Sequence, residues 1–304
     1  MKQPLSDEVH QQQKVASARE IKLFNNKVAP MSSESCTEGS IDSGDKVQQG
    51  MMKSQNGGLF ALCLITFRPN EKIEYLKFLN TFNSYDIYVI IDDNIGNYES
   101  LKSQFKNINF IQIDDKSCLI DGFSNLSFIT LKKPVTGWDK AVYYFEKINT
   151  KYEKVWFFED DVFFYSEETI INLDKKYKEQ DILCNSSYEE GKLNEWLWNK
   201  IKIEFKPPYF CGMMCCIRLS KKFLSCINEY ATKHKTLFFL EAFFPSIAKK
   251  YGLNIIKSPE EFKTITHRNT FDLNELNQNF LYHPKKNLEF HNIYRKYIEL
   301  YVCD

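Results

Sequence analysis

Three consecutive carboxylates interrupt an apolar stretch near the middle of the chain. Glu159, Asp160 and Asp161, the acidic triplet, lie inside the run VWFFEDDVFF at positions 155–164. Burying even one unpaired carboxylate is costly, so three in a row require either solvent or a bound cation. The aromatic and β-branched residues that precede them are typical of a strand buried on both faces. We therefore predict a strand over 155–158 that has the acidic triplet at its exposed carboxyl end.

The direction of these side chains favours a metal site. Side chains alternate along an extended segment, so Glu159 and Asp161 would face one side and Asp160 the other. Ligands of open α/β sheets bind at the carboxyl ends of the strands. The alternative is a charged turn after a buried strand, in which the carboxylates are solvated or cap the helix that the sequence SEET at 166–169 suggests.

The segments around the triplet alternate between apolar runs of strand length and stretches with helical spacing. Strands are predicted over 59–66, 86–92, 108–113 and 155–158, and helices over 71–82, 98–105 and 139–148. Apolar strands joined by helices form parallel pairs with crossover helices. The pattern predicts a Rossmann-like α/β fold with a mostly parallel sheet flanked by helices. Its loops after Thr66, Asp92 and Phe158 would lie along one edge.

The second half of the chain is less regular. Helices are predicted over 170–177, 220–230 and 237–251, and strands over 181–184 and 253–256, followed by a polar tail. Residues 207–218 are predicted to be a loop that enters a strand. Pro245 must occupy the first turn of the helix at 237–251 or kink it.

A nucleotide bound across the edge formed by the three loops would meet several charged side chains. Arg68 could pair with a phosphate in a bidentate manner. Asp92 and Asp93 could bond to the base or ribose, although they fit equally well as a strand end followed by a turn. Lys140 is a further candidate for diphosphate binding because its helix begins at the same edge, whereas Trp138 is expected to pack.

Two residues farther along the chain are candidates for the same site. His283 is one of five histidines, and on its own it is more typical of a surface or capping position. Glu241 is a lone carboxylate within LFFLEAFF at 237–244. It could be stabilised at a helix N-terminus by the helix dipole. Alternatively, desolvation would raise its pKa toward that of a general base that deprotonates a hydroxyl.

These positions together resemble the nucleotide-diphospho-sugar-dependent glycosyltransferases of the GT-A fold, over about residues 59–290. The resemblance lies in LITFR at 64–68, Asp92 and Asp93, the acidic triplet, and Glu241 with His283 downstream. GWDK at 137–140 and YHPK at 282–285 resemble more narrowly the members found in large DNA viruses and some protists.

The resemblance implies a divalent cation, Mn²⁺ or Mg²⁺, bound by Asp161 and His283. It implies a UDP- or GDP-sugar donor in contact with Thr66, Arg68, Asp92, Asp93, Lys140, Glu159 and Asp160. The family often has Asp where this chain has Glu159. Inverting members have a carboxylate near the place of Glu241, which would act as the base toward a glycan or protein hydroxyl. The cation would neutralise the charge of the diphosphate as the glycosidic bond breaks.

Composition narrows the class of protein. The 304 residues include 40 Lys+Arg and 40 Asp+Glu, a balance that gives no reason to expect a nucleic-acid partner or a polybasic membrane binder. No apolar run is long enough for a transmembrane helix. Nine cysteines without CxxC spacing argue against a disulfide framework or a zinc site. We therefore expect a cytoplasmic protein, in the host cytoplasm if it is viral.

Residues 1–57 are polar and poor in aromatics, which predicts a disordered leader ahead of a single domain at 58–304. Two alternatives to a glycosyltransferase remain open. One is a sugar-phosphate nucleotidyltransferase, although the first loop lacks a Gly-rich, basic stretch to cradle phosphates. The other is a non-catalytic carbohydrate-binding protein on the same fold.

Overall fold

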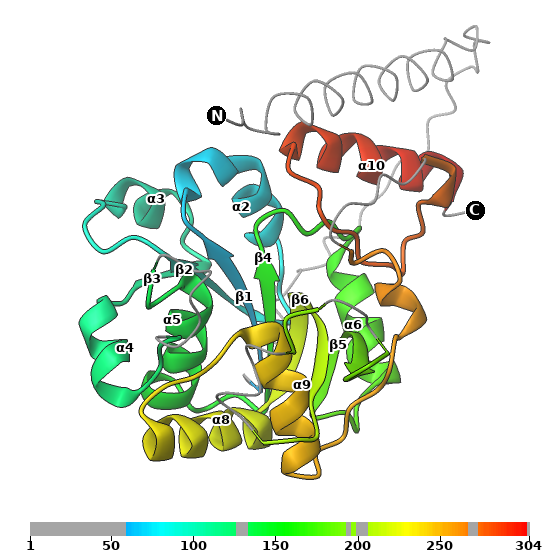
Figure 1. Cartoon of the computed structure of the whole chain (residues 1–304). Coiled ribbons are helices and arrows are strands. Elements are labelled where there is room, and N and C mark those ends of the chain that lie inside the picture. The colour runs from blue at the N-terminus through cyan, green and yellow to red at the C-terminus, as the bar shows by residue number, and fades with distance from the viewer. Residues whose placement is uncertain (1–58, 126–132, 193–195, 199–205, 267–272, 303–304) are drawn as a thin grey trace, which may run out of the picture. The chain divides into compact units, whose positions relative to one another are not determined.

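The computed structural model describes residues 59–125, 133–192, 196–198, 206–266 and 273–302 (Figure 1). The predicted disordered leader at 1–57 lies outside the described residues. None of the described helices is both long and apolar enough to cross a bilayer.

A six-stranded sheet forms the centre of the described part, in the order β3-β2-β1-β4-β6-β5. Its strands are β1 (Phe60–Thr66), β2 (Asp86–Ile91), β3 (Ile108–Gln112), β4 (Lys154–Glu159), β5 (Ile182–Glu189) and β6 (Phe210–Ser220). The pairs β1–β2, β2–β3 and β1–β4 are parallel, whereas β6 runs antiparallel to both β4 and β5. The prediction of a mostly parallel α/β sheet flanked by helices is confirmed.

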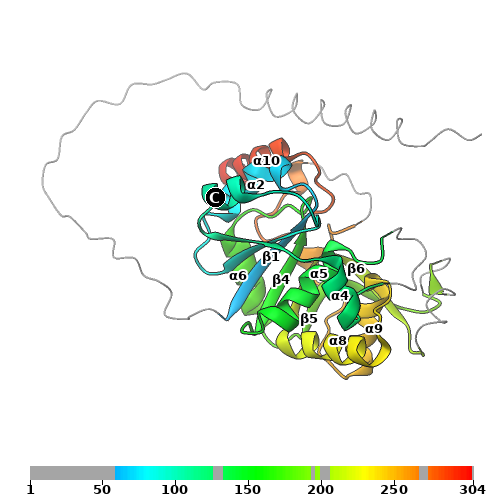
Figure 2. The same ribbon diagram turned by 90° about the vertical axis from the view of Figure 1, so that its left-hand side faces the viewer.

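Helices cover both faces of this sheet. The α-helices are α2 (Ile73–Leu79), α3 (Glu99–Gln104), α4 (Asp115–Asp121), α5 (Gly137–Tyr143), α6 (Glu167–Lys176), α8 (Lys221–His234), α9 (Leu240–Lys250) and α10 (Leu288–Tyr301). Short turns of other helix types are η1 (Pro69–Lys72), η2 (Tyr144–Ile148), η3 (Glu260–Phe262) and η4 (Leu273–Glu275). Figure 2 shows the sheet between α6 on one side and α4 with α5 on the other.

Alternate residues of the central strands enter two different cores. In β1, Cys63 and Ile65 pack with the apolar sides of α5, α8 and α9, whereas Leu62 and Leu64 pack with those of α2 and α6. A strand with an apolar core on each side needs apolar residues at every position. This requirement explains the continuous apolar runs in the sequence.

Several predicted elements differ in the structure. The strand expected at 253–256 is reduced to an isolated bridge between Ile255 and Ile182. Only the first part of the helix expected at 139–148 is α-helical, and η2 completes it as a π-helix. Pro245 lies inside α9, beyond its first turn. The tail expected to be polar contains α10, which buries Phe290, Tyr294, Tyr297 and Ile298 on one face.

A buried ion pair links β6 to α6. The side chain of Arg218 is fully buried, and its Nη1 lies 2.6 Å from Oδ1 of Asp174. Its Nη2 donates to the carbonyl of Gln180 at 3.2 Å. We expect Asp174→Ala to lower the free energy of unfolding by about 3–5 kcal/mol, because it leaves a buried guanidinium without its counter-charge. Chemical denaturation measures this loss.

The control for this variant is Glu168→Ala, on the same helix. Glu168 pairs at 3.5 Å with Lys175, and both side chains are exposed. Exposed pairs stabilise proteins by about 1 kcal/mol or less. Equal losses for the two variants would contradict the account of Arg218.

Candidate active site

The loops that follow β1, β2 and β4 meet at one edge of the sheet. The parallel register pairs Thr66 with Ile91 and Ile65 with Glu159. The three strands therefore end at the same level, as predicted, and their carboxyl ends place the acidic triplet beside the loop of β1.

The acidic triplet divides between two sides of the chain. Asp160 turns toward the loop after β1, where its Oδ2 accepts a 2.5 Å hydrogen bond from Thr66 Oγ1. Its Oδ1 lies 3.1 Å from Nζ of Lys72. Glu159 and Asp161 instead both approach His283, in agreement with the predicted alternation of side chains. Two carboxylates and one imidazole thus share one side.

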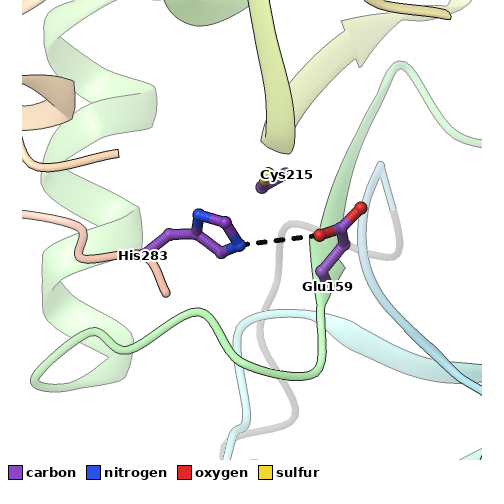
Figure 3. A group of neighbouring side chains, drawn as sticks. All are labelled: Glu159, Cys215 and His283. Carbon is purple, nitrogen blue, oxygen red and sulfur yellow. Dashed lines mark ion pairs between the residues drawn. The ribbon is translucent and has the colours of Figure 1, made fainter. Parts of the chain in front are cut away.

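Backbone pairing brings His283 to the triplet from the far end of the chain. Phe163 and Tyr282 exchange two backbone hydrogen bonds of 2.8 Å each. His283 then lies with its Nε2 3.2 Å from Asp161 Oδ1 and 3.7 Å from Glu159 Oε2. Figure 3 shows the imidazole facing the Glu159 carboxylate.

The orientation of the His283 ring suits the binding of a divalent cation. Nδ1 of His283 lies 2.8 Å from the carbonyl oxygen of Thr266, and a carbonyl can only accept, so Nδ1 carries hydrogen. In the neutral imidazole, Nε2 then presents its lone pair to the carboxylates. Asp161 Oδ1 is buried and faces this nitrogen at 3.2 Å. An imidazole and carboxylates are suitable ligands for Mn²⁺.

The charges of the group shift one another's pKa values. Burial raises the pKa of Glu159. Burial also acts to raise the pKa of Asp161, but contact with His283 outweighs it and the pKa falls below its ordinary value. For His283 burial acts to lower the pKa, but Asp161 and the Thr266 carbonyl raise it overall. The imidazole and Asp161 therefore stabilise each other's charged forms.

Glu241 lies at the start of α9, close enough for the charges of Glu159 and His283 to shift its pKa. It occupies the first turn of that helix. Its pKa is raised to about 7, mainly by burial and then by the charge of Glu159, while His283 acts to lower it. The protonated and ionised forms of Glu241 are thus both populated near neutral pH. A group with this property can accept a proton and release it again.

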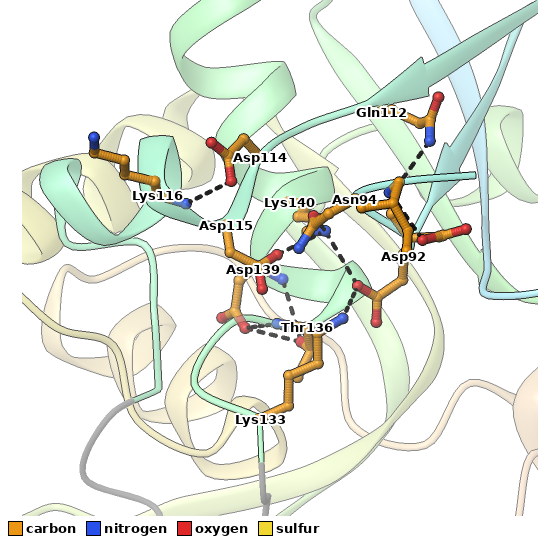
Figure 4. Close-up of polar contacts among 12 residues, drawn as sticks. Asp92, Asn94, Gln112, Asp114, Asp115, Lys116, Lys133, Thr136, Asp139 and Lys140 are labelled. Atoms are coloured by element: carbon orange, nitrogen blue, oxygen red, sulfur yellow. Dashed lines mark hydrogen bonds and ion pairs between the residues drawn. The ribbon is translucent and has the colours of Figure 1, made fainter. Parts of the chain in front are cut away.

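A second polar cluster lies at the carboxyl ends of β2 and β3 (Figure 4). Lys140 is fully buried at its centre, with Nζ 2.7 Å from Asn94 Oδ1, 2.8 Å from Asp115 Oδ1 and 3.4 Å from Asp92 Oδ1. Lys133 forms another ion pair with Asp92. The charge of Lys140 is thus compensated inside the protein, and the side chain does not reach solvent. This position does not fit the predicted diphosphate contact.

The side chains of Asp93 and Arg68 interact within their own loops. Asp93 accepts a 2.7 Å hydrogen bond from the Tyr98 hydroxyl and a 3.1 Å bond from the backbone of Ile95, as expected for the turn that was the alternative interpretation. Arg68 is exposed, and its Nη1 lies 3.2 Å from Glu71 Oε1. The residues predicted to bind the nucleotide-sugar therefore do not all lie in one cluster.

Helix α5 joins the two clusters. Trp138, expected to pack, is buried and also donates from Nε1 to Glu159 Oε1 at 2.9 Å, while Lys140 reaches Asp92 from the same helix. Gly137 lets the helix begin directly against the sheet edge. A Cβ there would lie 2.6 Å from Ile65 Cγ2 and 3.1 Å from Asp92 Cβ.

Cys215 is a residue of the site that the sequence did not indicate. In the antiparallel register, Phe158 of β4 pairs with Cys216 of β6, so Glu159 and Cys215 are the next pair outward. One ligand atom each from Glu159, Cys215 and His283 lie within 4.8 Å of one another (Figure 3). Only the pairing of β6, distant in sequence, could have revealed this neighbour.

Comparison with known proteins finds no matching family model and no matching curated protein. Solved structures with a similar fold include the mannosyltransferase Ktr4p from S. cerevisiae in complex with GDP, with 11% identity, a TM-score of 0.38, and coverage of 81% of this chain and 77% of that chain. The galactosyltransferase LgtC in complex with donor and acceptor sugar analogs has 12% identity and a TM-score of 0.44, with coverage of 78% and 95%.

A third similar structure is the 4-diphosphocytidyl-2C-methyl-D-erythritol synthase from Anaerococcus prevotii. It has 8% identity and a TM-score of 0.41, with coverage of 80% of this chain and 97% of that chain. Likenesses at this level carry no argument about activity, which must come from the residues of this chain.

Proposed function

We propose that the chain is a metal-dependent glycosyltransferase of the GT-A type, which moves a sugar from a UDP- or GDP-sugar to a hydroxyl group of a glycan or protein. The observation that supports this most is the meeting of Glu159, Asp161 and His283 at the carboxyl edge of the sheet. Their charges also shift the pKa of Glu241. The narrower kinship with members from large DNA viruses and protists rests on the sequences GWDK and YHPK alone. The seven cysteines of the described part are all free, which fits a cytoplasmic setting.

The cation would be held by Asp161 and His283. It would supply positive charge to the diphosphate leaving group as the glycosidic bond breaks. The protein's own residues prepare the site: the Thr266 carbonyl orients the imidazole, and Trp138 holds Oε1 of Glu159. Thr66 and Lys72 fix Asp160 on the opposite side, toward the donor's ribose or sugar hydroxyls.

Glu241 would act as the general base. The acceptor oxygen forms a bond to the anomeric carbon while the bond from that carbon to the diphosphate breaks, and the hydroxyl proton passes to the Glu241 carboxylate. A single in-line displacement of this kind inverts the configuration at the anomeric carbon. The pKa of Glu241, about 7, is suited to accepting this proton at neutral pH.

The donor's nucleoside would lie over the loops after β1 and β2. Asp92 is the proposed contact to the base or ribose, and buried Lys140 would hold Asp92 in place. Arg68 and Asp93 remain proposed contacts at the rim. Arg68 would have to exchange its partner Glu71 for a phosphate.

A donor screen tests the proposal. The purified chain is incubated with UDP-, GDP- and TDP-sugars, with Mn²⁺ or with a chelator, and the released nucleotide is measured. We expect nucleoside diphosphate release from one donor class in the presence of Mn²⁺, and none with the chelator. No release from any donor by folded protein would favour a carbohydrate-binding protein. Pyrophosphate release from a nucleoside triphosphate and a sugar phosphate would instead identify a nucleotidyltransferase.

A further inference from the structure

The proposed metal site contains a sulfur atom. Cys215 is 8% exposed, and its Sγ belongs with a carboxylate oxygen of Glu159 and a ring nitrogen of His283 to a set of atoms no more than 4.8 Å apart. Ligands of a tetrahedral zinc ion, with bonds of about 2.0–2.3 Å, lie roughly 3.5 Å from one another. The three side chains would therefore have to close by roughly 1 Å around an ion.

The backbone holds two of these side chains together without help from an ion. Residues directly opposite each other on antiparallel strands have their side chains on the same face. Glu159 ends β4 where β6 still continues, so the thiol of Cys215 lies next to the carboxylate at the sheet edge. Because β6 is buried along its whole length, Cys215 cannot turn away to solvent.

A simpler role for this thiol is that of a neutral hydrogen-bond donor to Glu159. Burial, the charges of Glu159, Asp161 and Glu241, and a hydrogen bond to Glu159 all hold the pKa of Cys215 far above its ordinary value. The thiol is therefore protonated while no cation is bound. A divalent cation held by Glu159, Cys215 and His283 would add positive charge beside the sulfur and would favour the thiolate.

We propose that Cys215 is a ligand of the metal site and makes it selective for thiophilic divalent cations such as Zn²⁺, Co²⁺ or Cd²⁺ over Mg²⁺. On binding, the S–H bond breaks, a metal–sulfur bond forms, and one proton leaves to solvent for each ion, with no change of oxidation state. Glu159 and His283 are the other two ligands of the set. Asp161 lies outside this set, and its Oδ1, 3.2 Å from His283 Nε2, would have to move toward the ion to become a further ligand.

The chemistry of the donor atoms gives the expected selectivity. Thiolate and imidazole suit Zn²⁺ and related ions, whereas Mg²⁺ requires oxygen ligands and retains its water. The proposal rests on the metal site of the proposed function and names the class of ion that it takes. It also explains why a Cys, and not a Ser or Thr, opposite Glu159 would matter for function.

Cobalt titration of the full, metal-free chain tests the proposal. A thiolate bound to Co²⁺ absorbs strongly in the near ultraviolet by charge transfer, and oxygen and nitrogen ligands do not give this band. We expect the wild type to develop the band with one equivalent of Co²⁺. Cys215→Ser preserves a hydrogen-bond donor for Glu159 and removes the sulfur, so the band should vanish and Co²⁺ affinity should fall by about tenfold.

Cys226→Ser is the matched control, because Cys226 is a free, partly exposed thiol on α8. It should leave both the band and the affinity unchanged. Cobalt binding without the band in the wild type, or a band that persists in Cys215→Ser, would overturn the proposal while leaving the metal site intact. No cobalt binding at all would overturn the metal site too. Binding of UDP or GDP, measured separately by calorimetry, would then show whether a nucleotide site survives.

Discussion

Asp161→Asn is expected to lower kcat/KM for sugar transfer by about a thousandfold, roughly 4 kcal/mol of transition-state stabilisation. The substitution retains the size of the side chain and removes the negative charge that faces His283 at 3.2 Å. Its Oδ1 is buried, and an ion bound there would replace the charge of the imidazole as its counter-charge. The concentration of Mn²⁺ needed for half-maximal rate should rise strongly.

Asp160→Asn is the matched variant from the same acidic triplet. Asp160 turns away from His283 toward Thr66 and Lys72, so its loss should affect donor binding more than metal binding. We expect a loss of about tenfold in kcat/KM, mainly through the KM of the donor, with an unchanged Mn²⁺ requirement. If both variants changed the Mn²⁺ dependence equally, the assignment of Asp161 to metal binding and of Asp160 to donor binding would be wrong.

The central strands could be predicted from sequence because each is buried on both faces. The predicted ranges 59–66 and 86–92 match β1 and β2 to within a residue at each end, and 155–158 lies inside β4. Strands of this kind require apolar residues at nearly every position, so the length of each apolar run indicates the length of the strand. The same reasoning predicts the acidic triplet at the carboxyl end of its strand, and Glu159 is the last residue of β4.

Helix α4 is harder to predict from the sequence than the central strands. Helix α4 buries only Cys118 and is defined by its caps, Asp114 at the start and Gly122 in the left-handed region at the end. It therefore lacks the apolar spacing from which a helix is predicted. Asp115 on this helix supplies the partner that compensates Lys140, and without α4 the burial of Lys140 could not be foreseen.

Part of the site can likewise be predicted from a short stretch of sequence, and part depends on contacts between distant segments. The triplet is a local pattern, whereas the position of His283 depends on the pairing of Tyr282 with Phe163. The approach of Cys215 depends on the antiparallel register of β6. Register between distant segments is decided by tertiary packing, and a single sequence gives no direct measure of it. The acidic triplet and His283 could therefore be predicted as candidate ligands, but their contacts with each other and with Cys215 could not.

Glu241→Gln is expected to lower kcat by a factor of about 10²–10⁴, because glutamine cannot accept the proton of the acceptor hydroxyl. The wild-type kcat/KM should rise with pH up to about 7, as Glu241 ionises, and this rise should be absent in the variant. Rates measured across pH at saturating metal check both expectations. A variant with a wild-type rate and pH profile would show that Glu241 is not the base.

The same substitution should stabilise the fold at high pH. The pKa of Glu241 is raised from 4.5 to about 7 by burial and by Glu159, so the folded state holds its proton more tightly than the unfolded state. The free energy of unfolding therefore falls as pH rises through this range, by up to about 3 kcal/mol, and stays reduced above it. Glutamine has no such cost.

Metal-free Glu241→Gln should thus be more stable than the wild type at about pH 8, and the difference should shrink steadily as the pH falls toward 4.5. Chemical denaturation at several pH values measures it. A variant that loses activity and gains stability would show that the Glu241 carboxylate destabilises the fold and is needed for catalysis. Loss of activity with equal stability at every pH would mean that Glu241 is an ordinary helix N-terminal carboxylate, and the base would have to be sought elsewhere.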